Sequence, residues 1–325
     1  MNASNAERVG PFFIVGASRS GTTLLRLMLS GHSRLHITPE TWFIRPLLER
    51  LPIDRPLDAT EREWAINSIV DDYRWPDLGV DEIRLRAAVV DRPSVKVRDL
   101  TDAVYACIAA DAGKPRLGDK TPMYVEILPQ LAKLYPDAQF IYLLRDGRDV
   151  ALSYIDAGWG YRCYEGDRFE WTVAVRAARA FAATAPATKW LEIRYEDLVR
   201  APETVLRRLC DFLGEDFEPA MLDFASRADL VPERERGIHP RVSGAVDAGR
   251  AGAWQSRLSP GELFVLESCL GGDLRSDGYA LRYSGAAWQP ALGLARAALT
   301  AAAPALLRAL PALHRRGMLP KGLLI

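Results

Sequence analysis

Residues 16–23 have the composition of an anion-binding loop. They read Gly-Ala-Ser-Arg-Ser-Gly-Thr-Thr and lie between an apolar run over 11–15, which predicts a buried strand, and a helical pattern over 22–30. In a glycine-framed turn, successive backbone N–H groups can point at one spot, and the N-terminus of the next helix adds partial positive charge. The loop therefore suits a phosphate-like group. The alternative is a tight strand–helix turn that carries a surface arginine.

The cation of this loop distinguishes it from the ATP-binding P-loop. Gly16 and Gly21 have the P-loop spacing, but Thr22 stands where a lysine normally follows. Arg19 is the only cation of the loop. Because the lysine that contacts the β and γ phosphates is missing, the sequence disfavours kinase or ATPase chemistry.

A second strand–turn–helix segment carries a second candidate anion site. The run over 139–144 predicts a strand, and a helix is expected over 148–156. Arg145 lies where the strand ends, and Ser153 follows eight residues later. Because open α/β sheets bind ligands at the carboxyl ends of their strands, these two side chains could converge on one ligand. Asp146 and its neighbours could instead be structural, as a helix cap with a paired arginine.

The sequence pattern around these loops predicts an α/β protein. Its parallel sheet would carry the P-loop-like turn and would be flanked by helices. Short apolar runs alternate with helical patterns from 11 to about 281, including a strand over 190–194. The expected organisation is a tail over 1–9, one large domain over 10–285 with a helical lid inserted over 50–115, and a basic Ala/Leu-rich tail over 286–325.

Composition disfavours several classes of protein. Basic and acidic residues number 42 each, so the formal net charge is zero and a generally basic nucleic-acid binder is not expected. The four cysteines are far apart and form no C-x-x-C pair, which signals neither a zinc site nor a disulfide scaffold. The sequence shows neither a signal peptide nor an apolar run long enough to span a bilayer. We therefore expect a cytoplasmic protein with reduced thiols.

Four segments, in order, resemble the sulfotransferases that use 3′-phosphoadenosine 5′-phosphosulfate (PAPS). Residues 19–23 are similar to the 5′-phosphosulfate loop of that family, and Arg145 with Ser153 is similar to its 3′-phosphate motif. Arg-Tyr-Glu-Asp-Leu at 194–198 is similar to a segment that places an aromatic ring near the adenine. Gly-Arg-Ala-Gly-Ala-Trp at 249–254 is similar to a loop that closes over the nucleotide.

Two further segments bring the resemblance nearest to the tyrosylprotein sulfotransferases and their bacterial relatives. Pro-Glu-Thr at 39–41 follows the phosphosulfate helix, as a Glu-Thr pair does in that branch. Gly-Asp-Lys-Thr-Pro at 118–122 is similar to the Lys-Asp-Pro segment of that branch, with Thr121 in place of aspartate. The cytosolic phenol and steroid branch uses a histidine base, which has no convincing counterpart in this sequence.

The resemblance implies a role for each candidate residue. The residues implied in nucleotide binding are Arg19, Ser20, Gly21, Thr22 and Thr23 at the 5′-phosphosulfate, Arg145, Ser153 and Arg250 at the 3′-phosphate, and Tyr195 at the adenine. Catalysis would depend on Arg19, on Lys120 as a cation at the bridging oxygen, and on Glu40 as the general base. These cations would supply the positive charge that sulfuryl transfer needs, so no metal site is expected.

Several alternatives stay open. Glu40 could begin the helix that follows Pro39, Tyr195 could be a packed residue at a strand end, and His36 or His239 could be the base. For the whole chain, the alternatives are a P-loop nucleotide kinase or NTPase and a non-catalytic nucleotide-binding protein.

The acceptor is not specified by the sequence. The lid and the stretch over 156–185 are expected to line the acceptor cleft, which would suit a glycan, a lipid, a peptide or a small metabolite. The aromatic residues of that stretch are Trp159, Tyr161, Tyr164 and Trp171.

The tail over 286–325 has five basic residues and no acidic one. As an amphipathic segment it could make peripheral contact with the inner membrane surface. It could instead pack on the body of the protein or extend from it. The sequence predicts no oligomeric state.

Overall fold

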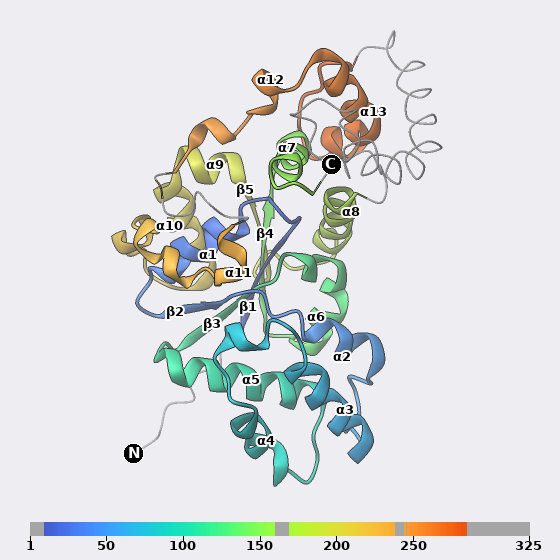
Figure 1. Ribbon diagram of the computed structural model, residues 1–325, viewed down its shortest axis with the longest axis vertical. Coiled ribbons are helices and arrows are strands. Elements are labelled where there is room, and N and C mark those ends of the chain that lie inside the picture. The colour runs from blue at the N-terminus through green and yellow to red at the C-terminus, as the bar shows by residue number, and fades with distance from the viewer. Residues whose placement is uncertain (1–9, 160–168, 238–243, 245, 285–325) are drawn as a thin grey trace, which may run out of the picture.

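The structure, a computed structural model, describes residues 10–159, 169–237, 244 and 246–284. Five parallel strands form one sheet in the order β2-β3-β1-β4-β5. The strands are β1 (Phe12–Gly16), β2 (Leu35–Thr38), β3 (Arg116–Lys120), β4 (Gln139–Leu144) and β5 (Trp190–Arg194). Figure 1 shows the sheet at the centre of the molecule.

The helices lie before, between and after these strands. The α-helices are α1 (Thr22–Ser30), α2 (Ile44–Arg50), α3 (Ala59–Val70), α4 (Glu82–Val90), α5 (Val97–Ala112), α6 (Leu128–Leu134), α7 (Gly147–Asp156), α8 (Glu170–Ala182), α9 (Tyr195–Arg200), α10 (Pro202–Leu213), α11 (Glu233–Arg236), α12 (Trp254–Arg257) and α13 (Pro260–Ser276). Short 3-10 helices are η1 (Trp75–Leu78), η2 (Pro122–Ile127), η4 (Pro219–Leu222), η5 (Ala225–Leu230) and η6 (Ala248–Arg250).

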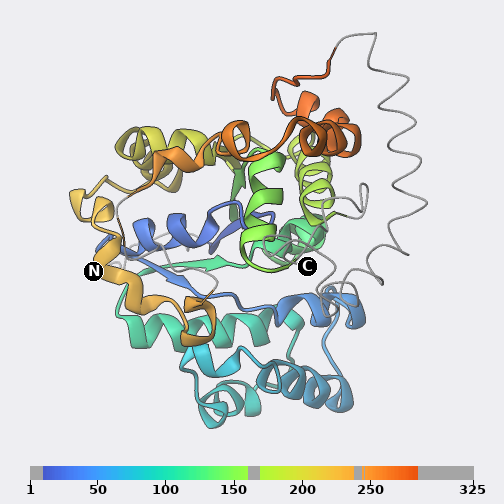
Figure 2. The same cartoon turned by 45° about the horizontal axis from the view of Figure 1, so that its top comes forward.

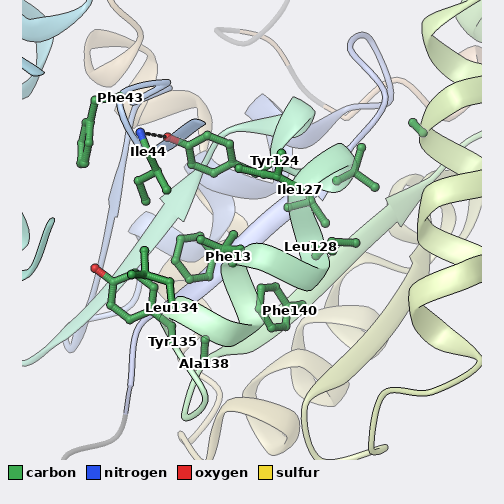
Figure 3. Close-up of a cluster of buried hydrophobic side chains, with 14 of the residues drawn as sticks. Phe13, Phe43, Ile44, Tyr124, Ile127, Leu128, Leu134, Tyr135, Ala138 and Phe140 are labelled. Carbon is green, nitrogen blue, oxygen red and sulfur yellow. Dashed lines mark hydrogen bonds between the residues drawn. The ribbon is translucent and has the colours of Figure 1, made fainter. Parts of the chain in front are cut away.

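Two cores cover the two faces of the sheet, because successive side chains of a strand point to opposite faces. From β1, Phe12 and Ile14 pack with α1, α9 and α10, whereas Phe13 and Val15 pack with α5, α6 and α8 (Figures 1 and 2). In the second core the Phe13 ring stacks on Phe140 at a centroid distance of 5.6 Å (Figure 3). Burial of both faces makes the sheet a rigid support for the loops at its edges.

The parallel register brings the functional loops to one edge of the sheet. Gly16 lies beside Leu143, and Thr38 lies beside Asp119. The loops that follow β1, β2, β3 and β4 therefore leave the sheet at its carboxyl edge, where open α/β sheets bind ligands.

The predicted α/β class, parallel sheet and flanking helices are confirmed. The predicted strands over 139–144 and 190–194 match β4 and β5, and the one over 11–15 matches β1 with a shift of one residue. The sequence analysis missed β2 and β3. Segment 50–115 is largely helical, but its last helix, α5, packs into the main core through Leu100 and Val104. Its action as a lid stays a prediction.

No helix in the described part of the chain is both long and apolar enough to cross a membrane.

Candidate active site

Two glycines let the loop between β1 and α1 pack closely on its neighbours. A Cβ atom at Gly16 would lie 2.7 Å from the carbonyl oxygen of Leu143. At Gly21, where φ is +102°, a Cβ atom would lie 2.5 Å from the Tyr195 ring. Only glycine fits these contacts. The loop that starts α1 therefore lies against the end of β4 and the start of α9.

The N-terminus of α1 opens toward the predicted anion site. The helix begins after Gly21 with no side-chain cap and no acidic residue in its first turn. Thr22 and Thr23 form that first turn and are buried, and the Ser20 hydroxyl donates a hydrogen bond to the Ala17 carbonyl at 2.7 Å. The partial positive charge of the helix terminus is therefore not offset by a capping carboxylate.

A carboxylate from α8 anchors the same loop. The Ser18 N–H donates to Glu170 Oε1 at 2.7 Å, and the Tyr154 hydroxyl donates to Glu170 Oε2 at 2.6 Å. The loop is thus connected to both α7 and α8. Sequence reasoning missed Glu170, because an acidic residue in the first turn of a helix gives no sign of a partner 152 residues away.

Arg145 lies at the end of β4 and is almost completely buried. Its Nη1 donates to the Arg19 carbonyl at 2.9 Å, its Nη2 donates to the Arg250 carbonyl at 3.2 Å, and its guanidinium lies 4.2 Å from the centre of the Tyr195 ring. Its Nε is buried and has no hydrogen-bond partner among the described residues. Because buried donors are nearly always paired, this Nε fits an anionic ligand.

Arg19 and Ser153 meet beside Arg145. Arg19 Nε donates to Ser153 Oγ at 3.1 Å, and the Arg19 guanidinium lies 5.5 Å from the Trp159 ring centre. Burial, together with the positive charge of Arg145, lowers the pKa of Arg19. The structure therefore brings the two predicted anion sites together, and an anion between the two arginines would relieve their repulsion.

The side chain of Arg250 lies at the edge of this cluster. Its Nη1 pairs with Asp156 Oδ2 at 3.4 Å, and its Nε lies 3.8 Å from Asp247 Oδ2. The backbone carbonyl of Arg250, and not its side chain, contacts Arg145.

Glu40 and Lys120 form a buried ion pair on the other side of the β1–α1 loop. Lys120 Nζ donates to Glu40 Oε1 at 3.0 Å, while Trp42 Nε1 and Arg74 Nη2 donate to Glu40 Oε2 at 2.8 and 3.3 Å. Burial raises the pKa of Glu40, but Lys120, Trp42 and Arg74 outweigh it, so the pKa lies below its ordinary value. The carboxylate is therefore ionised at neutral pH, and both of its oxygens have partners.

A fully buried aspartate, Asp119, holds the residues next to this ion pair. Asp119 accepts hydrogen bonds from the Tyr105 hydroxyl at 2.6 Å and from the hydroxyls of Thr41 and Thr121 at 2.7 Å each. Burial raises the pKa of Asp119 to about 6, although these hydrogen bonds favour the ionised form. Because Thr41 follows Glu40 and Thr121 follows Lys120, this network fixes the backbone on both sides of the ion pair.

A second carboxylate, Glu235 in α11, was not foreseen from the sequence. Glu235 is buried, and its side-chain carboxylate makes no hydrogen bond or ion pair with any described residue. Burial raises the pKa of Glu235, against the positive charge of Lys120. Its neighbour Arg234 anchors α11 by pairing with Asp77 at 3.0 Å and by donating to the Tyr73 carbonyl. Glu235 is therefore a buried carboxylate from a separate element whose ionisation is influenced by the charges of Lys120 and Glu40.

The remaining candidate residues lie away from the site or outside the described part of the chain. His36 lies inside β2 opposite Leu117, and burial with the charges of Arg26 and Lys114 lowers its pKa to about 4. Glu40 does not begin a helix, because α2 starts only at Ile44. His239, Tyr161, Tyr164 and the tail over 286–325 lie outside the described residues.

The expectation that Trp171 lines the acceptor cleft is wrong. Its side chain is almost completely buried, and its Nε1 donates to the carbonyl of Arg145 at 2.8 Å. Gly147 packs against the indole so closely that a Cβ atom there would lie 2.8 Å from it. Trp171 therefore belongs to the core that supports Arg145.

Within the described residues, no group of three or more His, Cys, Asp or Glu side chains is arranged to hold a metal ion.

Residues 11–219 match the family model described as the sulfotransferase family. Over 291 residues, the chain is 29% identical to Nodulation protein NoeE of Sinorhizobium fredii, an alignment that covers 81% of this chain and 64% of that protein. Over 216 residues, it is 31% identical to Protein-tyrosine sulfotransferase 1 of Danio rerio, with 65% of this chain and 54% of that protein covered. The chain thus spans less than two thirds of the length of either relative.

Solved structures show the same architecture. The sulfotransferase domain of the Synechococcus PCC 7002 olefin synthase aligns with a TM-score of 0.60 and 26% identity, covering 86% of this chain and 98% of that one. The sulfotransferase domain from the curacin biosynthetic pathway aligns with a TM-score of 0.54 and 24% identity, covering 84% and 98%.

Proposed function

Because the chain belongs to the sulfotransferase family, we propose that it transfers a sulfuryl group from PAPS to a hydroxyl group of an acceptor. The observation that carries the proposal is the buried Nε of Arg145, which has no hydrogen-bond partner in the described part of the chain and lies beside the Arg19–Ser153 contact. A donor left unpaired in the interior is costly, and a phosphate oxygen would satisfy it. Arg145 Nη1 also contacts the carbonyl of Arg19 in the loop before α1, which supports one nucleotide whose two anionic ends bind at these two sites.

The 5′ end of the donor would lie at the β1–α1 loop. We assign its binding to the loop amides, to the hydroxyls of Thr22 and Thr23 in the first turn of α1, and to Arg19. The glycine at position 21 supports this role, because its lack of a side chain lets the loop pack against the Tyr195 ring where α1 begins. Ser20 holds the turn through its bond to the Ala17 carbonyl.

The 3′ end would lie at Arg145 and Ser153, with Arg250 at the rim. The guanidinium of Arg145 keeps its place through two backbone carbonyls and the Tyr195 ring, which leaves Nε for the phosphate. Tyr195 is then the residue that lies nearest the adenine side, as the resemblance implies. This site would separate PAPS from nucleotides that lack a 3′-phosphate.

The chemistry would take place at the Glu40–Lys120 pair. Transfer breaks the S–O bond to the bridging oxygen of the donor and forms an S–O bond to the acceptor oxygen, while the acceptor loses its proton. As negative charge grows on the bridging oxygen, Lys120 would turn its ammonium group toward it. Glu40 Oε1, freed from Lys120, would then accept the acceptor proton.

The acceptor would lie on the side of Glu40 next to segment 50–115, where polar groups are available. Arg74 from that segment contacts Glu40, and its Nε is buried with no hydrogen-bond partner in the described structure. The charges of Lys120 and Glu40 influence the ionisation of Glu235 in α11. Two such polar groups support an acceptor with hydrogen-bonding groups near its reacting hydroxyl. A glycan, a lipid headgroup, a peptide and a small metabolite all meet this description.

We also propose a cytoplasmic location, with peripheral contact between the tail over 286–325 and the inner membrane surface. The support is the composition of the tail, five basic residues and no acidic one. Vesicles with and without anionic lipid would test it: the full chain should sediment with anionic vesicles and a chain ending at 285 should not.

The experiment that tests the donor assignment compares 3′,5′-bisphosphoadenosine with 5′-AMP and ATP in thermal unfolding. At a hundredfold excess over its Kd, a ligand stabilises the folded state by about 2.7 kcal/mol. The bisphosphate should therefore raise the Tm by several degrees, while the other two nucleotides should raise it little. Equal shifts would refute the 3′-phosphate site. Transfer of radiolabel from PAPS into extracts of the host then tests the reaction itself.

A further inference from the structure

The segment over 247–257, here called the late loop, lies across one face of α7 (Figure 2). It comprises η6, a turn at Gly252 and α12. Asp149, in the first turn of α7, accepts two hydrogen bonds from the late loop: Gly252 N–H donates to Oδ2 at 2.7 Å, and Trp254 N–H donates to Oδ1 at 2.9 Å. Asp149 is only 1% exposed, so these two amides are held by a buried carboxylate.

Two further contacts fix the late loop to α7. The Arg148 guanidinium lies 3.7 Å from the centre of the Trp254 ring, and it is held in place by Asp146 at 2.8 Å and by Glu267 at 2.7 Å. At the other end of α7, Asp156 binds Arg257 through two bonds of 2.9 and 2.7 Å. Asp149 and Asp156 are seven residues apart, two helical turns, so they lie on the same face of α7.

The late loop supplies one of the contacts that orient Arg145. The carbonyl of Arg250, two residues before Gly252, accepts the hydrogen bond from Arg145 Nη2 at 3.2 Å. Gly252 adopts φ +87°, which lets the chain turn directly between that carbonyl and the amides that Asp149 holds. A shift of the late loop would therefore remove one of the two carbonyls that orient the Arg145 guanidinium.

We propose that Asp149 is a positioning residue that latches the late loop to α7 and thereby sets the preference of the protein for a 3′-phosphorylated nucleotide. The proposal rests on the proposed function, because it takes Arg145 as the 3′-phosphate ligand. Asp149 acts through Arg250 and Arg145.

The side chain at this position has to be a short carboxylate. The two N–H groups point at one buried spot, and only a carboxylate offers two acceptor oxygens there. Asparagine would keep one acceptor but turn its amide donors toward the other N–H. Charge-assisted hydrogen bonds are also stronger than neutral ones, so the carboxylate holds the late loop more firmly than an amide could.

The test compares wild type with Asp149→Asn in two measurements. By calorimetry, the Kd for 3′,5′-bisphosphoadenosine should rise about tenfold in Asp149→Asn, equivalent to about 1.4 kcal/mol, while the Kd for 5′-AMP should not change. By hydrogen exchange without nucleotide, peptides covering 247–257 should exchange faster in the variant, because one of the two amides, that of Gly252 or that of Trp254, loses its acceptor.

The matched control is Asp273→Asn. Asp273 is also a buried carboxylate, but its partners Arg176 and Arg179 lie on α8. This variant should leave both Kd values and the exchange of the late loop unchanged, even if its Tm falls. If Asp149→Asn does not fold, Asp156→Asn takes its place, because it loosens the late loop from a more exposed position. It should raise the Kd for the bisphosphate about threefold.

The outcomes distinguish the proposed role of Asp149 from the assignment of the 3′-phosphate site. If wild type prefers the bisphosphate and the loop variants keep that preference in full, the positioning role of Asp149 is refuted. If wild type binds both nucleotides equally, the 3′-phosphate assignment fails. Hydrogen exchange of 247–257 alone then tests whether Asp149 attaches the late loop to α7. Faster exchange in Asp149→Asn then supports the attachment to α7, and unchanged exchange overturns it.

Discussion

Replacing Glu40 by glutamine tests the centre of the proposed mechanism. Glutamine keeps the shape of the side chain, but it has one acceptor oxygen instead of two and cannot hold a proton from the acceptor. A general base contributes about 10²- to 10⁴-fold to a rate. We therefore expect kcat to fall at least a hundredfold, while the Kd for 3′,5′-bisphosphoadenosine stays within about twofold of wild type.

The same substitution has a cost in stability that the geometry defines. Lys120 is fully buried, and Glu40 is its one ion-pair partner within the described residues. Leaving a buried charge unpaired costs about 3 to 5 kcal/mol, and the glutamine oxygen recovers part of this by accepting from Lys120 Nζ. For a domain of this size each kcal/mol lowers the Tm by about 2 to 4 °C, so a fall of several degrees is expected.

The pH dependence gives a further readout for Glu40. Its pKa is lowered, so the carboxylate stabilises the fold above its unfolded-state pKa, and this stability is lost as the pH falls through the folded-state pKa. Activity should fall over the same acidic pH range as stability does, because the base must be ionised. In Glu40→Gln this contribution to the acid limb of the stability profile should be absent.

The assay is transfer of radiolabel from PAPS to an acceptor-containing extract, with nucleotide binding measured in parallel. Glu126→Gln is the control, since Glu126 is also a partly buried carboxylate but pairs with Arg45 at 2.9 Å, outside the Glu40–Lys120 pair. It should keep full activity. If Glu40→Gln keeps more than half of the wild-type kcat, Glu40 is not the base, and Glu235→Gln becomes the variant to examine.

Three further outcomes follow from the geometry. Arg145→Lys should weaken binding of 3′,5′-bisphosphoadenosine about 10- to 100-fold in calorimetry, with 5′-AMP unaffected, because lysine cannot hold two carbonyls and a phosphate in one plane; equal losses for both nucleotides would contradict this. Gly21→Ala should lower the Tm by several degrees, since φ is +102° and the Tyr195 ring lies 2.5 Å from the new Cβ; an unchanged melt would refute the tight contact. Because burial raises the pKa of Asp119 to about 6, the stability this group contributes is present below its ordinary 3.8 and lost as pH rises through 6. Asp119→Asn should flatten the Tm profile between pH 4 and 6, and an unaltered slope would show that Asp119 does not titrate there.

The β1–α1 loop and the end of β4 were predictable because their signals are local. An apolar run, a glycine-framed turn and an amphipathic helix lie next to one another in the chain, so composition and period suffice. The same holds for the position of Arg145 directly after an apolar strand. The family assignment follows from these two loops together with the segments over 194–198 and 249–254, and the family match confirms it.

β3 could not be predicted from its own residues. Arg-Leu-Gly-Asp-Lys has no alternation of apolar and polar side chains, and both Asp119 and Lys120 are completely buried. Their burial is compensated by Thr41, Tyr105 and Glu40, which come from two other parts of the chain. A strand that breaks the usual pattern because it carries site residues gives no strand signal in a single sequence.

The positions of Trp171 and Glu235 could not be predicted from the sequence either. Trp171 was expected at the cleft and is in the core, whereas Glu235 was not expected near the site. An indole near a candidate cleft suggests ligand contact, yet Trp171 packs beneath Arg145. Glu235 lies in a short charged helix that has no pattern, yet its carboxylate is buried near Lys120. Both placements depend on how distant segments meet.

The contact between Lys120 and Glu40 would have a protective effect between turnovers of the proposed reaction. As long as the ammonium group holds Glu40 Oε1, the carboxylate is a poorer proton acceptor for water that enters the site. In the proposed mechanism Lys120 would leave Glu40 as charge grows on the bridging oxygen, once an attacking hydroxyl is in line. Hydrolysis of the activated sulfate would thereby stay slow when no acceptor is bound.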